Sequence, residues 1–298
     1  PDDWVYVYNF NNARHPIVLH FPAGQGSKFQ TMLHQTWQTS FKQLERRFSA
    51  ETYHNRIEKI RMITGNEQHH ALVELTREGE ELDLKLIHRN DEHCFIPTHV
   101  KDDQIEEMSQ EDINALNSKE RAEINANIRY MDKKLERLGL QIGDLEDEAR
   151  DLVSELNRDI AKQVIIPRIE LILNKFTSVD GLEQYLKLYA EDIIENVETV
   201  LEQEDIDFSP AHFNRVPARY QANVVISNKA NTGAPVIFED FPTHYNLLGH
   251  VEQLTQQGTI STDFTLIRPG ALHRANGGFL MLEADQLLEQ PYAWQGLK

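Results

Sequence analysis

Two glycines and a carboxylate enclose a short apolar run near the C-terminus, Gly277-Gly-Phe-Leu-Met-Leu-Glu283. Four apolar residues are too few for a helix, so the run predicts a buried parallel strand with Glu283 at its C-terminal tip. Open α/β sheets bind their ligands at this edge. A carboxylate there can reach the water shell of a magnesium ion that accompanies a nucleotide. The chemistry indicated is nucleotide binding, although an apolar strand that ends in an acid also occurs in ordinary α/β proteins.

Hydrolysis of a nucleotide needs a further group beside this carboxylate. A second acidic residue normally follows the first and orients the attacking water. Ala284 stands in that position and can neither accept a proton nor align a water. Asp285 does not replace it, because in an extended strand its side chain would point to the Glu283 face. We therefore expect nucleotide hydrolysis to be weak or lost.

The residues around this strand resemble a known family. The run Gly270-Ala-Leu-His-Arg-Ala-Asn-Gly-Gly-Phe-Leu-Met-Leu-Glu283 is similar to the Walker B region of Lon-like proteases of the archaeal B type and their bacterial relatives. Magnesium chelatases and bacterial enhancer-binding activators share a weaker version of it, so the run specifies a group of AAA+ modules. The resemblance implies ATP and magnesium as ligands of the whole protein. By this resemblance, the candidate residues for binding the nucleotide and its magnesium ion are Glu283, Asn276, Gly277 and Gly278. Arg274 is a candidate arginine contact.

The N-terminal segment contains a second stretch that superficially suggests phosphate binding. Trp4–Phe10 and Pro16–Phe21 predict a pair of strands, and the glycine-containing turn Pro22–Lys28 follows them. The turn lacks the Gly-Lys-Ser/Thr order that would bring a lysine to the phosphates and a hydroxyl to magnesium. We therefore interpret it as a turn in which Ser27 caps the next helix. The segment again resembles the Lon-like family, where it lies downstream of the phosphate loop.

Strand patterns occupy both ends of the chain, whereas the middle is helical. After Pro217 the apolar runs predict further strands, and Phe238–Gly249 resembles the stretch that precedes the Walker B strand in B-type Lon proteins. We predict that residues 1–30 and 215–298 are two parts of one split AAA+-like α/β module that share a sheet. Residues 31–214 would form a helical insertion with a coiled-coil arm, so the fold class is α/β plus all-α.

The most regular feature of the insertion is an apolar repeat over Ile124–Leu156. Its apolar residues lie alternately four and three positions apart in the sequence, which predicts a coiled-coil seam on one long helix. Gly139 and Gly143 lie off the seam, and a break within Leu138–Asp144 is the alternative. The helix should stop or kink before Pro167.

Three smaller patterns complete the insertion. Leu182–Val200 presents an apolar stripe that could pack back on the long helix. Leu82–His88 and Glu92–Pro97 alternate around a polar turn at Arg89–Asp91, which predicts a small β-hairpin. His69, His70 and Glu74 could share one helix face. No metal site is expected there, because no further ligand lies at metal-binding spacing from them.

Composition narrows the partners of the protein. The formal net charge of −18 argues against a general nucleic-acid surface, since backbone phosphates would be repelled. Cys94 is the only cysteine, which excludes an internal disulfide. No apolar stretch approaches the length that crosses a bilayer. We expect a protein of the cytoplasm that has no membrane partner.

The resemblance also implies a function. A helical arm and an AAA+-like region would recognise or gate unfolded or damaged proteins for a serine-lysine peptidase domain C-terminal to this chain, within a hexameric ring. The chain itself supplies no peptidase dyad, because Ser27 and Lys28 are adjacent and lack a setting that activates the hydroxyl. Phe264 is the candidate aromatic contact for a translocating polypeptide. The alternatives are a non-proteolytic AAA+ remodeller, which Ala284 disfavours, and a coiled-coil scaffold, which needs no Walker B-like run.

Overall fold

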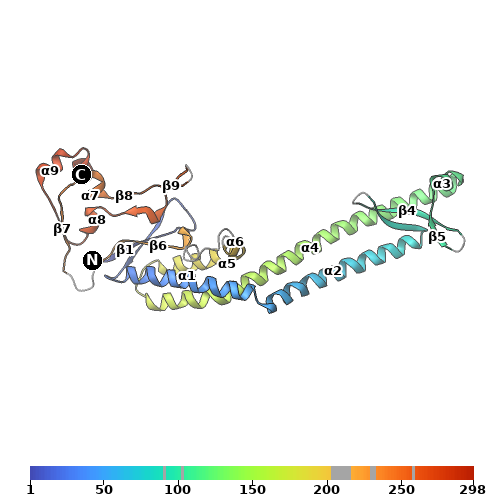
Figure 1. The fold of residues 1–298 in the computed structure, drawn as a ribbon, viewed down its shortest axis with the longest axis horizontal. Helices are drawn as coiled ribbons and strands as arrows, with labels where there is room; N and C mark the ends of the chain where they lie inside the picture. The colour runs from blue at the N-terminus through green and yellow to red at the C-terminus, as the bar shows by residue number, and fades with distance from the viewer. Residues whose placement is uncertain (90–91, 102–103, 203–215, 229–232, 257–258) are drawn as a thin grey trace. The chain divides into compact units, whose positions relative to one another are not determined.

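The structure, a computed structural model, describes residues 1–89, 92–101, 104–202, 216–228, 233–256 and 259–298 (Figure 1). The chain divides into two units. The terminal unit contains Pro1–Phe48 and Asn157–Lys298, and the arm unit contains Ser49–Leu156. The arm unit is smaller than the predicted insertion 31–214, because helical residues on both sides of it fold with the strands. The predicted boundary between residues 214 and 215 lies outside the described residues.

An antiparallel sheet in the order β2-β1-β6 forms the base of the terminal unit. Its strands are β1 (Asp3–Val7), β2 (Ile17–Phe21) and β6 (Ala222–Ile226). Val5 of β1 is buried and lies opposite Leu19 on one side and Val224 on the other. The predicted N-terminal strand pair is confirmed, and the two ends of the chain do meet in this sheet.

The strand before Glu283 lies in another sheet, which contradicts the prediction of one shared sheet. β12 (Phe279–Leu282) pairs in parallel with β7 (Val236–Glu239). The predicted parallel pairing is confirmed, but the predicted burial is wrong, since Phe279 is 63% and Met281 51% exposed. Side chains alternate along a strand, and only one face of this pair packs on a core, through Ile237, Leu280 and Leu282.

A small core holds the C-terminal segment around this pair of strands. Its buried residues come from four short helices and are Leu247, Ala271, Leu287 and Ala293. The helices are α7 (His244–Leu248), α8 (Ala271–Arg274), α9 (Ala284–Glu289) and α10 (Ala293–Leu297). The remaining short elements of the terminal unit are η1 (Ala218–Tyr220), β8 (His250–Val251), β9 (Leu254–Gln256), β10 (Thr259–Ser261), η2 (Phe264–Leu266) and β11 (Ile267–Arg268).

Helix α1 (Gly26–Phe48) begins against the sheet. The backbone N–H of Gly26 donates to the carboxylate of Asp3 at 2.8 Å, and a negative charge at a helix N-terminus is stabilising. The prediction that Ser27 caps this helix is therefore wrong. Ser27 lies inside the first turn, with its hydroxyl 3.4 Å from the hydroxyl of Ser227. The cap comes from Asp3 of β1, which is 23 residues away and cannot be identified from the sequence of the turn alone.

Aromatic side chains fill the space between α1 and α5 (Leu182–Glu195). Trp37 of α1 stacks on Tyr220 with ring centroids 4.4 Å apart, and Tyr189 of α5 meets the same ring at 5.4 Å. The hydroxyl of Tyr220 donates to Asp192 of α5 at 2.6 Å. These contacts show that the apolar stripe of α5 packs in the core of the terminal unit. The short helix α6 (Val197–Glu202) follows α5.

The arm unit contains α2 (Glu51–Glu80) and most of the 58-residue helix α4 (Ser118–Lys175). The prediction of one long helix is confirmed, and Leu138–Asp144 contains no break. Helix α4 also continues through Pro167, so of the predicted stop or kink at this proline the stop does not occur. The proline removes one hydrogen bond, but buried neighbours keep the helix packed, among them Val164, Ile165 and Ile169.

The seam of α4 packs against α2, not against the helix that follows it in the chain. Leu75 of α2 shares a core with Met131 and Leu138 of α4, and Glu78 pairs with Lys134. The segment Leu182–Val200 does meet the long helix, as predicted, but beyond the seam: Arg158 of α4 pairs with Glu195 of α5 at 3.1 Å, and the side chain of Asn157 donates to Glu198. Further along α4, Leu152 is 46% exposed.

A three-stranded antiparallel sheet completes the arm unit. Its strands are β3 (Leu84–Arg89), β4 (Glu92–Lys101) and β5 (Gln104–Glu107), so the predicted hairpin is confirmed and a third strand joins it. The turn residues 90–91 lie outside the described residues. Helix α3 (Gln110–Ala115) follows, with a capping box between Ser109 and Asp112 that lowers the pKa of the Asp112 carboxyl.

Candidate functional site

The carboxyl edge of the β7–β12 pair is the first candidate site. The two strands end together, with Leu282 opposite Glu239. Glu283 follows Leu282 and is exposed at the start of α9, where its side chain caps no backbone group. The structure therefore places the predicted carboxylate at a strand tip, accessible to solvent.

Glu239 is a second carboxylate at this edge, and sequence reasoning did not select it. Arg274, the candidate arginine contact, donates to Glu239 at 2.8 Å, which links α8 to the end of β7. The signal was available, because Glu239 ends an apolar run just as Glu283 does. Since its guanidinium is engaged by a neighbouring carboxylate, Arg274 has a structural partner already.

The candidate residues Asn276, Gly277 and Gly278 form the turn between α8 and β12. Gly277 has φ +74°, a left-handed conformation that favours glycine. A Cβ atom on Gly278 would lie 1.9 Å from the carbonyl oxygen of Pro235, so only glycine fits there. Asn276 donates its backbone N–H to His273 at 3.1 Å. The two glycines are thus explained by the path of the backbone into β12.

The position after Glu283 does not supply the second acidic group. Ala284 is the first residue of α9, and Asp285 lies in the first turn of that helix, beyond the end of the strand. Among the described residues, no group of three or more His, Cys, Asp or Glu side chains could hold a metal ion. Magnesium in nucleotide sites is held by one or two carboxylates together with waters and phosphates, so the exposed Glu283 could reach its water shell, but this edge supplies no second acid to orient an attacking water.

The turn Pro22–Lys28 does not offer a phosphate site either. A phosphate at a helix N-terminus binds to backbone N–H groups of the first turn. In α1, the N–H of Gly26 is taken by the carboxylate of Asp3. The backbone N–H of Asn228 donates to the other oxygen of the same carboxylate at 2.6 Å. An anionic ligand would have to displace a buried anion.

Phe264 does not fit the role of an exposed substrate contact. Its side chain is only 8% exposed, in the 3₁₀ helix η2. The ring lies 6.2 Å from the ring of Tyr8, between centroids, and the backbone carbonyl accepts a hydrogen bond from Asn223 at 2.8 Å. The prediction of an exposed aromatic at this position is therefore wrong, since Phe264 packs on β1 and β6.

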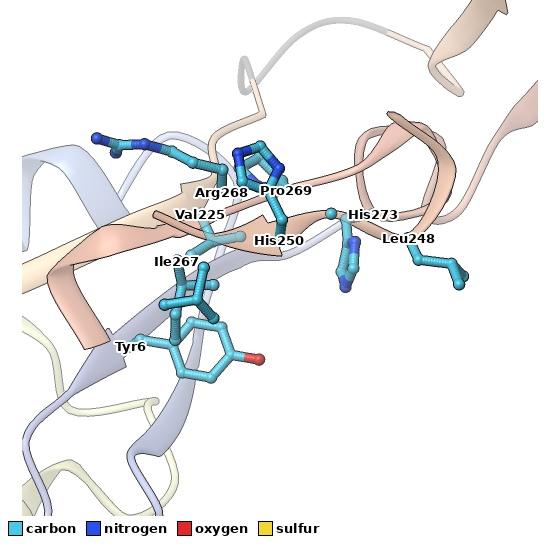
Figure 2. Close-up of a pocket in the computed structure, with 10 residues that line it drawn as sticks. Tyr6, Val225, Leu248, His250, Ile267, Arg268, Pro269 and His273 are labelled. Carbon is cyan, nitrogen blue, oxygen red and sulfur yellow. The ribbon is translucent and has the colours of Figure 1, made fainter. Parts of the chain in front are cut away.

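Figure 2 shows the hollow in the terminal unit where the sheet meets the C-terminal segment. It has a volume of about 210 Å³ and is lined by Tyr6 and Val225 of the sheet and by residues around β8, β11 and α8. The Tyr6 ring and the His273 imidazole extend to one side of the β8–β11 ribbon, and the guanidinium of Arg268 extends to the other (Figure 2).

Two polar side chains of this hollow, those of His273 and Arg268, have hydrogen-bond partners nearby. The imidazole Nδ1 of His273 accepts the backbone N–H of Gly270 at 3.2 Å. Arg268 pairs with Glu252 at 2.8 Å, and this hydrogen bond lowers the pKa of the Glu252 carboxyl. Among the described residues of the lining there is no serine, threonine, cysteine or lysine. The hollow therefore has no nucleophile for serine-lysine chemistry.

Two segments of the chain match known protein families. Residues 232–298 match the family described as LonB-like, AAA domain. Residues 3–36 match the family described as Lon-like LonC helical domain. No curated protein matches the chain. The first match covers β7, β12 and Glu283, and the second runs from β1 into α1.

The matches confirm the resemblance drawn from the Walker B-like run. The two matched segments support a relationship to the Lon-like proteases, with residues 232–298 similar to their AAA domain.

Proposed function

We propose that this chain is the AAA+-like and substrate-handling region of a Lon-like serine protease. It recognises or gates unfolded or damaged polypeptide for a serine-lysine peptidase domain located outside these residues. The proposal includes a hexameric assembly of the whole protein in the cytoplasm. ATP hydrolysis is weak or lost.

The observation that carries the proposal is the placement of the arm unit between two Lon-like segments. The matched residues 3–36 and 232–298 both belong to the terminal unit, whereas Ser49–Leu156 fold around a core of their own. A Lon-like region with a separate helical unit suits a protein that holds polypeptide before cleavage. A scaffold would have no use for the AAA domain.

The loss of hydrolysis rests on the residues after β12. Glu283 remains as an exposed carboxylate, but Ala284 opens a helix where a water-orienting acid is needed. Glu239 does not replace that acid, because Arg274 already binds its carboxylate. The same feature disfavours a remodeller that depends on ATP turnover.

No helix in the described part of the chain combines the length and apolar character needed to cross a membrane.

The direct test is binding of an unfolded protein by the purified chain. A reduced and alkylated protein should bind, and the same protein in its native, disulfide-bonded form should not. A coiled-coil scaffold predicts that neither form binds. If the chain fails to bind the unfolded form, the proposed function is wrong.

A further inference from the structure

A groove lies between α2 and α4 in the arm unit. It has a volume of about 300 Å³. Its apolar lining comes from Ala71 of α2 and from Leu138, Ile142 and Leu145 of α4. The polar side chains that complete the lining are Gln68, Gln141, Asp144 and Glu148.

The groove follows from unequal side chains on the two helices. At the well-packed level of the arm, Leu75 of α2 meets Met131 and Leu138, and these three are buried. Along the groove, α4 still presents isoleucine and leucine, but α2 offers Ala71 and Gln68. Small and polar side chains leave the facing apolar groups partly uncovered. The apolar seam therefore continues beyond the part that α2 fills.

The charge around the groove is negative. Asp144 and Glu148 line it, and none of the described lining residues is basic. Between Asp144 and Glu155, α4 carries six acidic residues and one arginine, Arg150, which pairs with Asp147. The arm unit as a whole has 26 Asp and Glu against 14 Lys and Arg, a net charge of −12. A cationic partner is favoured, and an anionic one is repelled.

We propose that this groove binds extended polypeptide segments in which apolar side chains stand next to lysine or arginine. The apolar side chain would cover Ile142 and Leu145, and the cation would lie beside Asp144 or Glu148. A second copy of the arm is a poor occupant, because two units of net charge −12 repel each other. The inference rests on the proposed function and names the class of segment that the arm selects.

The test uses the whole chain and two short labelled peptides. Both have the same leucine-rich centre, and one has lysine flanks while the other has glutamate flanks. The chain should bind the lysine peptide more tightly, and added salt should weaken that binding. The double variant Asp144→Lys/Glu148→Lys should bind the lysine peptide about tenfold more weakly and the glutamate peptide more tightly.

Two further variants distinguish binding in the groove from a general effect of the negative charge of the arm. Glu123→Lys/Glu136→Lys makes the same charge change on exposed sites of α4 outside the groove lining, and it should alter binding far less. Ala71→Leu should fill part of the groove and weaken both peptides. Thermal unfolding of each variant checks that the arm is intact.

The outcomes distinguish the two proposals. If the chain binds unfolded protein, but the groove variant and the control variant behave alike, the groove is not the binding site and this inference is overturned. The same holds if both peptides bind equally. If the chain binds neither unfolded protein nor peptide, the proposed function fails as well. Pairing of arms in the wild type, lost in the groove variant, would instead assign the groove to a second copy and contradict the inference.

Discussion

The carboxylate of Asp3 accepts the backbone N–H of Gly26 at 2.8 Å, although 23 residues separate the two. Its second oxygen accepts the backbone N–H of Asn228 at 2.6 Å. Asp3 is 0% exposed, so a single buried carboxylate joins β1, the start of α1 and the end of β6. This contact ties the first residues of the chain to the segment that precedes the AAA-like match at residues 232–298.

Asp3→Ala should lower the free energy of unfolding of the terminal unit by about 2–4 kcal/mol, because it leaves two backbone N–H groups without their acceptor. Denaturant unfolding followed by circular dichroism measures the effect. Asp2→Ala is the control, since the neighbouring side chain is exposed. Equal stability of the two variants would show that the carboxylate does not cap the helix.

Tyr220 and Tyr189 offer a matched pair within one aromatic cluster. Burial raises the pKa of both hydroxyls, and the hydrogen bond to Asp192 raises that of Tyr220 further. The hydroxyl of Tyr189 is buried and has no hydrogen-bond partner among the described residues. Tyr220→Phe should cost about 1.5–3 kcal/mol, because it removes a hydrogen bond to a charged group.

Tyr189→Phe should be neutral or slightly stabilising, because it removes a buried hydroxyl that satisfies nothing. Thermal unfolding of the two variants gives the comparison. A loss of stability in Tyr189→Phe as large as that in Tyr220→Phe would mean that a partner, such as a buried water, holds the Tyr189 hydroxyl.

The seam of α4 should contribute unequally along its length. Leu138→Ala should destabilise the arm unit by about 2–4 kcal/mol, because Leu138 is 6% exposed and packs against α2. Leu152→Ala should cost less than about 1 kcal/mol, since Leu152 is 46% exposed. Hydrogen exchange of α2 and α4 reports both effects. Equal losses would indicate that another element covers Leu152.

Patterns of local origin were predictable from the sequence. The apolar repeat of Ile124–Leu156 gave the long helix, because its period is set by the helix itself. The alternating residues on both sides of residues 90–91 gave the hairpin of β3 and β4 for the same reason. The strand before Glu283 was also predicted with its parallel pairing.

Choices between distant partners were not predictable. The stripe of α4 fits α2 and α5 equally well by period, and only the structure shows Leu75 against Met131. Likewise, the sequence predicts β2 as one neighbour of β1 but does not identify β6 as the other, since Val5 meets Val224 across most of the chain. Pro167 remains helical because tertiary packing overrides a local preference.

The candidate site was predicted in part. Glu283 does lie at a strand tip, but Glu239 was missed, and its ion pair with Arg274 depends on the pairing of β7 with β12. Phe264 was misjudged because the exposure of an aromatic side chain depends on its surroundings, here the ring of Tyr8, which directly follows β1. The glycines before β12 are explained by backbone geometry at Gly277 and Gly278.

Loss of ATP hydrolysis is tested by phosphate release from the purified full-length protein, measured with and without an unfolded protein. The rate should equal the background of a Glu283→Ala variant, because a missing water-orienting group typically costs about 10²–10⁴-fold in rate. The unfolded protein should still be degraded when ATP is omitted. Robust phosphate release that persists at a similar level in Ala284→Glu, together with degradation that requires ATP, would show that the protein does hydrolyse ATP and that another residue orients the water.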